Sequence, residues 1–139
     1  MKLNNVLFLG TVYASSLILL SSYQKKPHFD LKSSIKRGQE VYLAKCITCH
    51  MDQGEGIEGI YPPLAKSDYL MTDKKRSIQQ VLYGVSGEIK VNGKIYNQEM
   101  PGFSLTDEET SDVLNYVRNS FGNKGDAVTQ ELVKSSRKK

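Results

Sequence analysis

Both cysteines of the chain lie in one pentapeptide, Cys46-Ile47-Thr48-Cys49-His50, which brings two thiols and an imidazole together. On a helix-like turn, positions i, i+3 and i+4 point to one side. Two thiols at this spacing can form thioethers with a haem while the adjacent histidine reaches its iron, and C-x-x-C-H is typical of covalent haem attachment. The spacing therefore favours one covalently bound haem c.

Three other chemistries use the same residue types. A structural zinc site needs four nitrogen or sulfur ligands, and His28 is the one further histidine of the chain. A redox dithiol of the thioredoxin type needs its cysteine pair at a helix start within a βαβ unit, a pattern that the sequence does not indicate. A disulfide between Cys46 and Cys49 would close too short a loop to stabilise the fold much.

Met100 is the candidate for the second axial ligand of the iron, opposite His50. It lies in a loop, in Glu99-Met100-Pro101-Gly102, where proline and glycine restrict the backbone and no apolar helix face is present. Met71 is the rival candidate. A thioether ligand favours ferrous iron and raises the reduction potential relative to ligation by two histidines.

The imidazole of His50 also needs a partner for its second ring nitrogen. A metal-bound histidine usually donates this N–H to a carbonyl or carboxylate. The consecutive prolines Pro62 and Pro63 leave carbonyl groups outside regular structure, so we expect one of them to accept this hydrogen bond.

The elements that must position these residues are short helices separated by loops. Apolar residues at helical spacing predict a helix over about 35–46, capped by Ser33 or Ser34. A loop rich in glycine and proline follows it. A second helix is predicted to start at Thr72 or Asp73 and to end at Gly84.

The apolar period changes from helix to strand between residues 87 and 97. Asn92-Gly93 lies between alternating residues, and this dipeptide favours a type I′ hairpin turn because both turn positions need positive φ. Pairing outward from the turn sets Ile89 opposite Tyr96. The sequence therefore predicts a small β-hairpin.

A final strong helix is predicted from Thr106 to about Phe121. Glu109 stands three residues after Thr106, the spacing of a capping box, and Gly122 is expected to end the helix. One or two further turns are predicted from Gln130, before a basic end that frays.

The amino-terminal segment carries no charge from Leu3 to Gln24. Its apolar part, residues 6–20, has the size of a signal-peptide core and is short for a spanning helix, which needs about 20 apolar residues. We expect residues 1–24 to be a cleaved signal peptide, with a retained membrane anchor as the alternative. Either way, the chain is expected to be exported.

Composition excludes several classes of function. The chain has 139 residues, enough for one ordinary domain, and no phosphate-cradling glycine fingerprint. The formal net charge is +4, but residues 134–139 alone carry four positive charges and no negative one. A nucleic-acid-binding protein should instead carry its basic residues on the folded body, so no nucleic-acid partner is expected.

Residues 35–122 resemble the mono-haem class I c-type cytochromes of bacterial type. Residues 82–97 are similar to the insert of cytochromes that serve bacterial dehydrogenases and nitrite reductases. The other matching motifs are Arg37-Gly38-Gln39-Glu40-Val41-Tyr42, Cys46-x-x-Cys49-His50, Pro62-Pro63-Leu64-Ala65 and Met100-Pro101.

The resemblance implies a mainly α fold, the cytochrome c fold, with helices wrapped around one covalent haem and a small β-hairpin insert near 88–97. By the same resemblance the last helix passes closely over Gly38, where Tyr42 meets Tyr116. The expected organisation is a signal peptide or anchor (1–24), a linker (25–33), a cytochrome c domain (34–122) and a C-terminal extension with a basic end (123–139).

The function implied is that of a one-electron carrier in a respiratory or dehydrogenase chain, and not of an enzyme. The carrier is either free or the cytochrome subunit of an oxidoreductase in the periplasm or on the outer face of the cytoplasmic membrane. Redox proteins would be its partners, and residues 3–24 offer a membrane tether. The alternative is a peroxidase-like haem enzyme or a redox sensor with a labile sixth ligand. The residues expected to bind haem c are Cys46, Cys49, His50, Met100, Pro62, Pro63 and Leu64, with His50 and Met100 on the iron.

Overall fold

The computed structural model describes residues 29–138 of the chain. The predicted signal peptide or anchor (1–24), the first part of the linker (25–28) and Lys139 lie outside the described residues. The elements in chain order are α1 (Leu31–Lys45), α2 (Ile47–His50), α3 (Asp68–Thr72), α4 (Lys74–Tyr83), β1 (Ile89–Val91), β2 (Lys94–Tyr96), α5 (Asp107–Asn119) and α6 (Gln130–Ser136).

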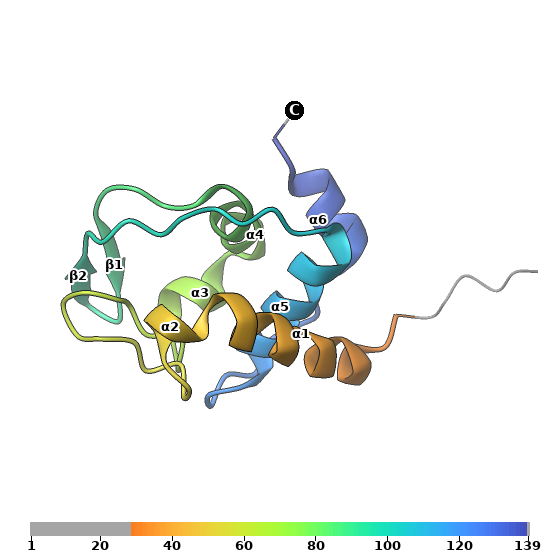
Figure 1. Cartoon of the computed structure of the whole chain (residues 1–139), viewed down its shortest axis with the longest axis horizontal. Helices are drawn as coiled ribbons and strands as arrows, with labels where there is room; N and C mark the ends of the chain where they lie inside the picture. Colours follow the sequence, from red (N-terminus) through yellow and green to blue (C-terminus); the bar gives the residue numbers. More distant parts are fainter. Residues whose placement is uncertain (1–28, 139) are drawn as a thin grey trace, which may run out of the picture.

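The helices α1 and α5 make the most extensive contact between elements (Figure 1). They cross at Gly38. A Cβ atom on Gly38 would lie 1.9 Å from the carbonyl oxygen of Asp112 and 2.9 Å from the Cβ of Tyr116. Only glycine allows the two backbones to approach so closely. The close passage of the last long helix over Gly38 is confirmed.

Three aromatic rings pack where these helices cross. The ring centroids of Tyr42 and Tyr116 are 5.3 Å apart, and Phe121 lies 5.3 Å from Tyr42 and 5.5 Å from Tyr116. The rest of the core joins α4, α5 and α6 through apolar side chains that are almost fully buried. These are Leu70, Ile78, Leu82, Leu105, Val113, Leu114, Val117, Val128 and Val133.

The predicted start of the first helix was wrong. Asp30 caps α1, because its carboxylate accepts hydrogen bonds from the backbone N–H groups of Lys32 and Ser33. Ser34 is buried inside the helix, and its hydroxyl donates to the Asp112 carboxylate at 2.5 Å. Residues 31–33, predicted as the end of the linker, therefore form the first turn of α1.

From α4 to the hairpin the elements follow the sequence pattern, whereas α3, which Ser67 caps, was not predicted. Asp73 caps α4 through a hydrogen bond from the Arg76 N–H, and Gly84 follows the helix with a φ of 82°. In the hairpin, Ile89 pairs with Tyr96, and both turn residues, Asn92-Gly93, have positive φ. The predicted hairpin and its register are confirmed.

The chain after α5 differs from the prediction. The helix ends at Asn119, and Phe121 adopts a φ of 57° that turns its ring into the aromatic cluster. The helix predicted from Gln130 is present, with Thr129 as its cap. Its end does not fray at Arg137, whose side chain forms an ion pair with Asp107 at 2.7 Å.

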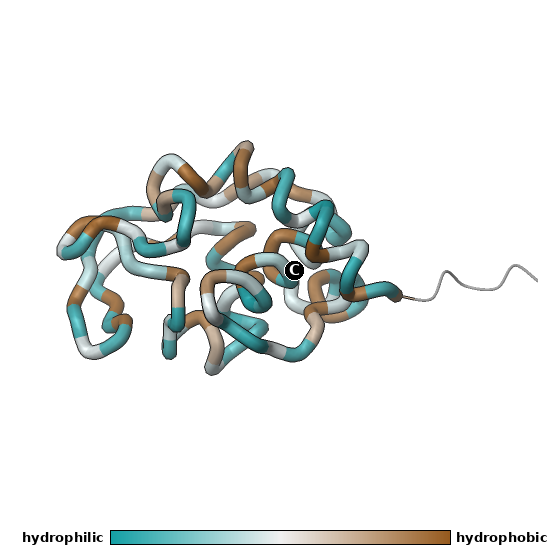
Figure 2. Tube along the Cα trace, turned by 90° about the horizontal axis from the view of Figure 1, so that it is seen from below, coloured by the Kyte–Doolittle hydropathy of each residue, from teal (hydrophilic) through white to brown (hydrophobic). Residues whose placement is uncertain are grey.

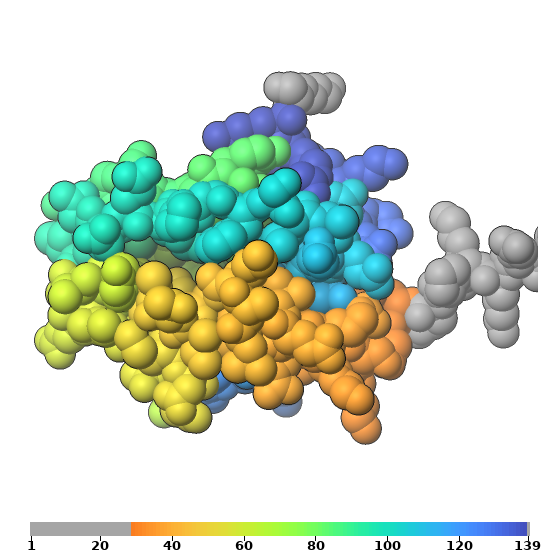
Figure 3. Space-filling view, viewed as in Figure 1, coloured from red at the N-terminus to blue at the C-terminus, as the bar shows by residue number. Residues whose placement is uncertain are grey.

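Hydrophobic residues recur in short runs along the trace (Figure 2). Among residues 29–138, no helix has the length and apolar character needed to cross a membrane. The space-filling view shows a narrow seam on this face of the molecule (Figure 3). The helices α1 and α2 lie on one side of the seam, and the segment that leads into α5 lies on the other.

Candidate functional site

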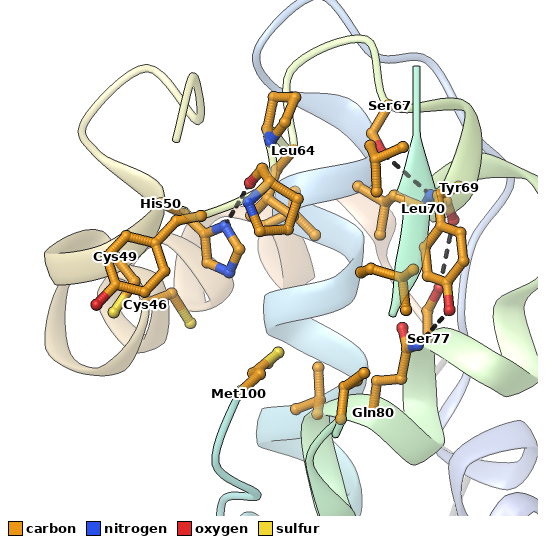
Figure 4. A pocket seen from close by; sticks show the side chains of 18 of the residues that line it. Cys46, Cys49, His50, Leu64, Ser67, Tyr69, Leu70, Ser77, Gln80 and Met100 are labelled. Atoms are coloured by element: carbon orange, nitrogen blue, oxygen red, sulfur yellow. Dashed lines mark hydrogen bonds between the residues drawn. The ribbon is translucent and has the colours of Figure 1, made fainter. Parts of the chain in front are cut away.

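Cys46 is the turn residue between α1 and α2, and the other four residues of the C-x-x-C-H motif form the single helical turn of α2. The N–H of Cys46 still donates to the Tyr42 carbonyl at 2.9 Å, and the N–H of His50 donates to the Cys46 carbonyl at 3.0 Å. This turn directs Cys46, Cys49 and His50 into one cavity of about 250 Å³. Figure 4 shows the two cysteines at one edge of this space.

The imidazole of His50 is buried and held in one orientation. Its Nδ1 lies 3.0 Å from the carbonyl oxygen of Pro62, so Nδ1 carries the proton that is donated and Nε2 keeps a free lone pair. Burial lowers the pKa of His50, opposed by this hydrogen bond. The side chain is therefore neutral, the form that binds metals.

The carbonyl partner of His50 comes from Pro62, the first of the two prolines. Pro62, Pro63 and Leu64 all line the cavity. The loop that carries them folds back on the turn, because the N–H of Leu64 donates to the Gly54 carbonyl at 2.7 Å.

Met100 occupies the wall opposite His50. Its backbone forms two hydrogen bonds with Val85, each of 2.9 Å, one donated from either residue. Figure 4 shows the Met100 side chain across the open space from the His50 ring. Met71, the rival candidate, does not line this cavity, and its methyl end lies against Gly125.

Cys46 lacks the lowered thiol pKa of a redox dithiol. The two thiols are not joined to each other, and burial together with repulsion from Cys49 raises the pKa of Cys46 to about 11. A reactive dithiol instead needs a lowered thiol pKa. The zinc alternative needed His28, which lies outside the described residues, and among residues 29–138 no three acidic, cysteine or histidine side chains gather as a metal site.

The cavity fits a haem by the chemistry of its lining. Two thiols are available for thioether bonds, and imidazole and thioether are both established ligands of haem iron. The walls are mostly apolar, as the faces of a porphyrin need. The apolar lining residues include Leu70, Val81, Val91, Phe103, Val113, Leu114 and Val117.

The match to known families decides the identity of this site. The family model described as Cytochrome c matches residues 35–121. The chain belongs to the cytochrome c family. Its cofactor is therefore a covalently bound haem c, its fold is the helical cytochrome c fold with a small hairpin, and its activity is haem-based electron transfer.

Named relatives of this cytochrome are bacterial. It is 38% identical over 88 residues to the cytochrome c subunit of a quinone alcohol dehydrogenase from Gluconobacter oxydans, covering 62% of this chain and 18% of that subunit. It is 40% identical over 90 residues to cytochrome c-552 from Thermus thermophilus, covering 61% of this chain and 68% of that protein. It is 32% identical over 109 residues to the fructose dehydrogenase cytochrome subunit of Gluconobacter japonicus, covering 72% of this chain and 22% of that subunit.

The sequence did not point to a polar group at the far end of the cavity of this cytochrome. The amide of Gln80 donates to the Tyr69 hydroxyl at 2.7 Å, and the Arg76 guanidinium lies 3.8 Å above the Tyr69 ring. Figure 4 shows Tyr69 and Gln80 remote from the two cysteines. The sequence did offer one sign of this group. Arg76 and Gln80 are four residues apart on the predicted helix, a spacing that places both side chains on one face.

Proposed function

We propose that this cytochrome is a one-electron carrier whose haem is attached through Cys46 and Cys49 and whose iron is held between His50 and Met100. The observation that carries the proposal is that His50 and Met100 face each other across one apolar cavity (Figure 4). When bound, haem c supplies an iron that alternates between the ferrous and ferric states.

The residues of the chain define how that iron is used. The Pro62 carbonyl fixes His50 in the tautomer whose Nε2 is free, and Met100 offers a neutral, soft sulfur that favours the reduced state. If His50 and Met100 both held the iron, peroxide or another external ligand would have to displace Met100 before it could bind. This supports a carrier over the peroxidase-like alternative.

Optical spectra of the oxidised and reduced protein test the axial pair. The wild-type protein should retain haem after denaturing extraction, and its oxidised form should show the weak long-wavelength band of an iron–methionine sulfur bond. We expect Met100→Ala to lose the band, to have a lower reduction potential and to bind added imidazole.

Met71→Ala is the matched control, because this methionine is also partly buried but lies outside the cavity. It should retain both the band and the potential. A Met100→Ala protein that keeps the band would overturn the assignment of Met100.

The electron donor is proposed to be a dehydrogenase. Support comes from the relatives named as cytochrome subunits of alcohol and fructose dehydrogenases. The apolar segment at residues 6–20 supports export to the periplasm or the outer face of the cytoplasmic membrane. Fractionation of cells and the mass of the purified protein would test export and cleavage, and a full-length protein in the cytoplasmic fraction would contradict export.

A further inference from the structure

The carboxyl end of the chain reaches both ends of the segment that carries Met100. We call residues 84–106, between α4 and α5, the Met100 segment. Its first residue follows Tyr83, the last residue of α4, and its last residue is Thr106, the cap of α5. Arg137 and Lys138, directly after α6, contact residues at these two junctions.

Arg137 holds the junction with α5. Its Nη2 donates to the carbonyl of Leu105 at 2.8 Å, and its Nε donates to the carboxylate of Asp107 at 2.7 Å. The N–H of Leu105 in turn donates to the carbonyl of Phe103, a residue that lines the haem cavity. One guanidinium therefore links the end of the Met100 segment to the first turn of α5.

Lys138 holds the junction with α4. Its backbone N–H donates to the Tyr83 hydroxyl at 2.8 Å, and its ammonium lies 4.7 Å from the centroid of the Tyr83 ring. Two residues after Tyr83, Val85 forms the paired backbone hydrogen bonds with Met100. The contact with Lys138 is thus two residues away from the direct partner of Met100.

The helix that presents these two residues is firmly docked. Val133 is fully buried and Ser136 is 2% exposed, and α6 packs against both α4 and α5 (Figure 1). A docked helix can restrain what its end contacts, whereas a frayed basic tail could not.

We propose that Arg137 is a positioning residue that keeps the Met100 segment closed over the haem cavity, with Lys138 as its partner at the other junction. The proposal rests on the proposed role of Met100 as the sixth ligand. Local opening of the Met100 segment would remove that ligand and expose the iron to external ligands. Because the apparent affinity of an external ligand scales with the fraction of open protein, imidazole reports the strength of this restraint.

The test is a titration of the ferric holoprotein with imidazole, comparing wild type with Arg137→Ala. We expect imidazole to bind roughly three- to tenfold more tightly to the variant. The effect should be no larger, because the ion pair between Arg137 and Asp107 is partly exposed to solvent. The long-wavelength iron–sulfur band should fade at a lower temperature than in the wild type. Arg137→Lys keeps the positive charge, but lysine cannot make the two simultaneous guanidinium hydrogen bonds. Its imidazole affinity should therefore lie between those of the wild type and Arg137→Ala.

Lys134→Ala is the matched control, since it removes an exposed positive charge from the same helix. It should leave imidazole affinity unchanged. A general loss of stability would lower the unfolding temperature of Arg137→Ala without changing imidazole affinity far below that temperature. Equal imidazole affinity in Arg137→Ala, Lys134→Ala and wild type would overturn the proposal.

Amide hydrogen exchange separates this proposal from the assignment of Met100. Residues 84–106 should exchange faster in Arg137→Ala than in Lys134→Ala, whichever group is the sixth ligand. A wild-type protein without the iron–sulfur band would refute Met100 ligation, while faster exchange in Arg137→Ala would still support the restraint. Unchanged exchange would overturn the restraint, whatever the spectrum of the wild type.

Discussion

The two walls of the haem cavity are built in different ways. On the His50 wall, the turn, the loop and the carbonyl partner all come from residues 46–64, within a short stretch of chain. On the opposite wall, the backbone of Met100 is bonded to Val85, and the residues that follow it bond to α4 through Phe103 and to the distant Arg137 through Leu105. One axial side chain is therefore held locally and the other by long-range contacts.

The difference has an energetic consequence. Bonds between near neighbours in sequence close short loops, which costs little conformational entropy. The contacts of the Met100 segment join residues far apart in the chain, at Leu105 and also at the hairpin turn, where Asn92 and Asp68 exchange hydrogen bonds. Its closure therefore costs more conformational entropy. We therefore expect the His50 wall to persist under conditions that already open the Met100 wall.

The largest expected effect is on the crossing of α1 and α5, a long-range contact outside both walls that stabilises the fold as a whole. In Gly38→Ala, the new Cβ would lie 1.9 Å from the backbone oxygen of Asp112, so the helices must separate. We expect a loss of about 3 kcal/mol or more in the free energy of unfolding, at or above the upper range for overpacking. Denaturant unfolding followed by far-UV circular dichroism measures it.

Gly59→Ala provides the control for Gly38→Ala. A Cβ on Gly59 would meet no atom within 4 Å, although its φ of 76° makes alanine strained there. This substitution should cost roughly 1 kcal/mol. Equal losses in the two variants would show that the close approach of α1 and α5 at Gly38 adds nothing to stability beyond the backbone strain at an exposed glycine.

A smaller effect, confined to the other wall, is expected for Gly102→Ala. A Cβ on Gly102 would lie 2.7 Å from the carbonyl oxygen of Leu82, which pushes the Met100 segment away from α4. We expect a loss of about 1–2 kcal/mol in the free energy of unfolding together with loss of the iron–sulfur band. The covalent haem should remain.

Gly87→Ala is the control within the same segment, because its φ of 86° is strained for alanine but its Cβ would meet no atom within 4 Å. It should keep the iron–sulfur band. If Gly102→Ala keeps the band too, the two walls respond alike and the comparison between them fails.

The sequence predicted the parts of this cytochrome that depend on local pattern. The hairpin, the capping box at Thr106 and the cap of α4 at Asp73 are each set by residues a few positions apart. The hydrogen bond between His50 and a proline carbonyl was also predicted, although not which proline supplies it. The ligand roles of His50 and Met100 stay predictions until the spectra are measured.

Two of the features that were missed depend on residues far apart in the chain. Ser34 was predicted as a possible helix cap, but its hydroxyl donates a hydrogen bond to Asp112 on the facing helix α5. The helix is capped by Asp30 instead. The basic end was predicted to fray, but Arg137 donates hydrogen bonds to the Asp107 carboxylate and the Leu105 carbonyl. No local pattern contains such pairings, since each depends on how the helices pack.

The smallest expected effect concerns the capping box where the Met100 segment meets α5. The carboxylate of Glu109 accepts from the N–H of Thr106 at 2.9 Å. This backbone hydrogen bond, followed by that from the Thr106 hydroxyl, lowers the pKa of Glu109. Because the folded state favours the ionised form, the resulting stability is present above the usual glutamate pKa of about 4.3 and is lost as pH falls through the lowered value.

Glu109→Gln keeps the geometry of the capping box and removes its charge. At pH 7 we expect its thermal midpoint to lie roughly 1–3 °C below that of the wild type, because a negative charge in the first turn stabilises a helix modestly. The difference should shrink as the pH falls through the lowered pKa of Glu109, where the wild-type side chain becomes neutral as well. The control is Glu88→Gln, an exposed carboxylate before β1, whose midpoint should follow that of the wild type at every pH. A difference between Glu109→Gln and wild type that does not change with pH would assign the effect to geometry. The junction of the Met100 segment would then not depend on this charge.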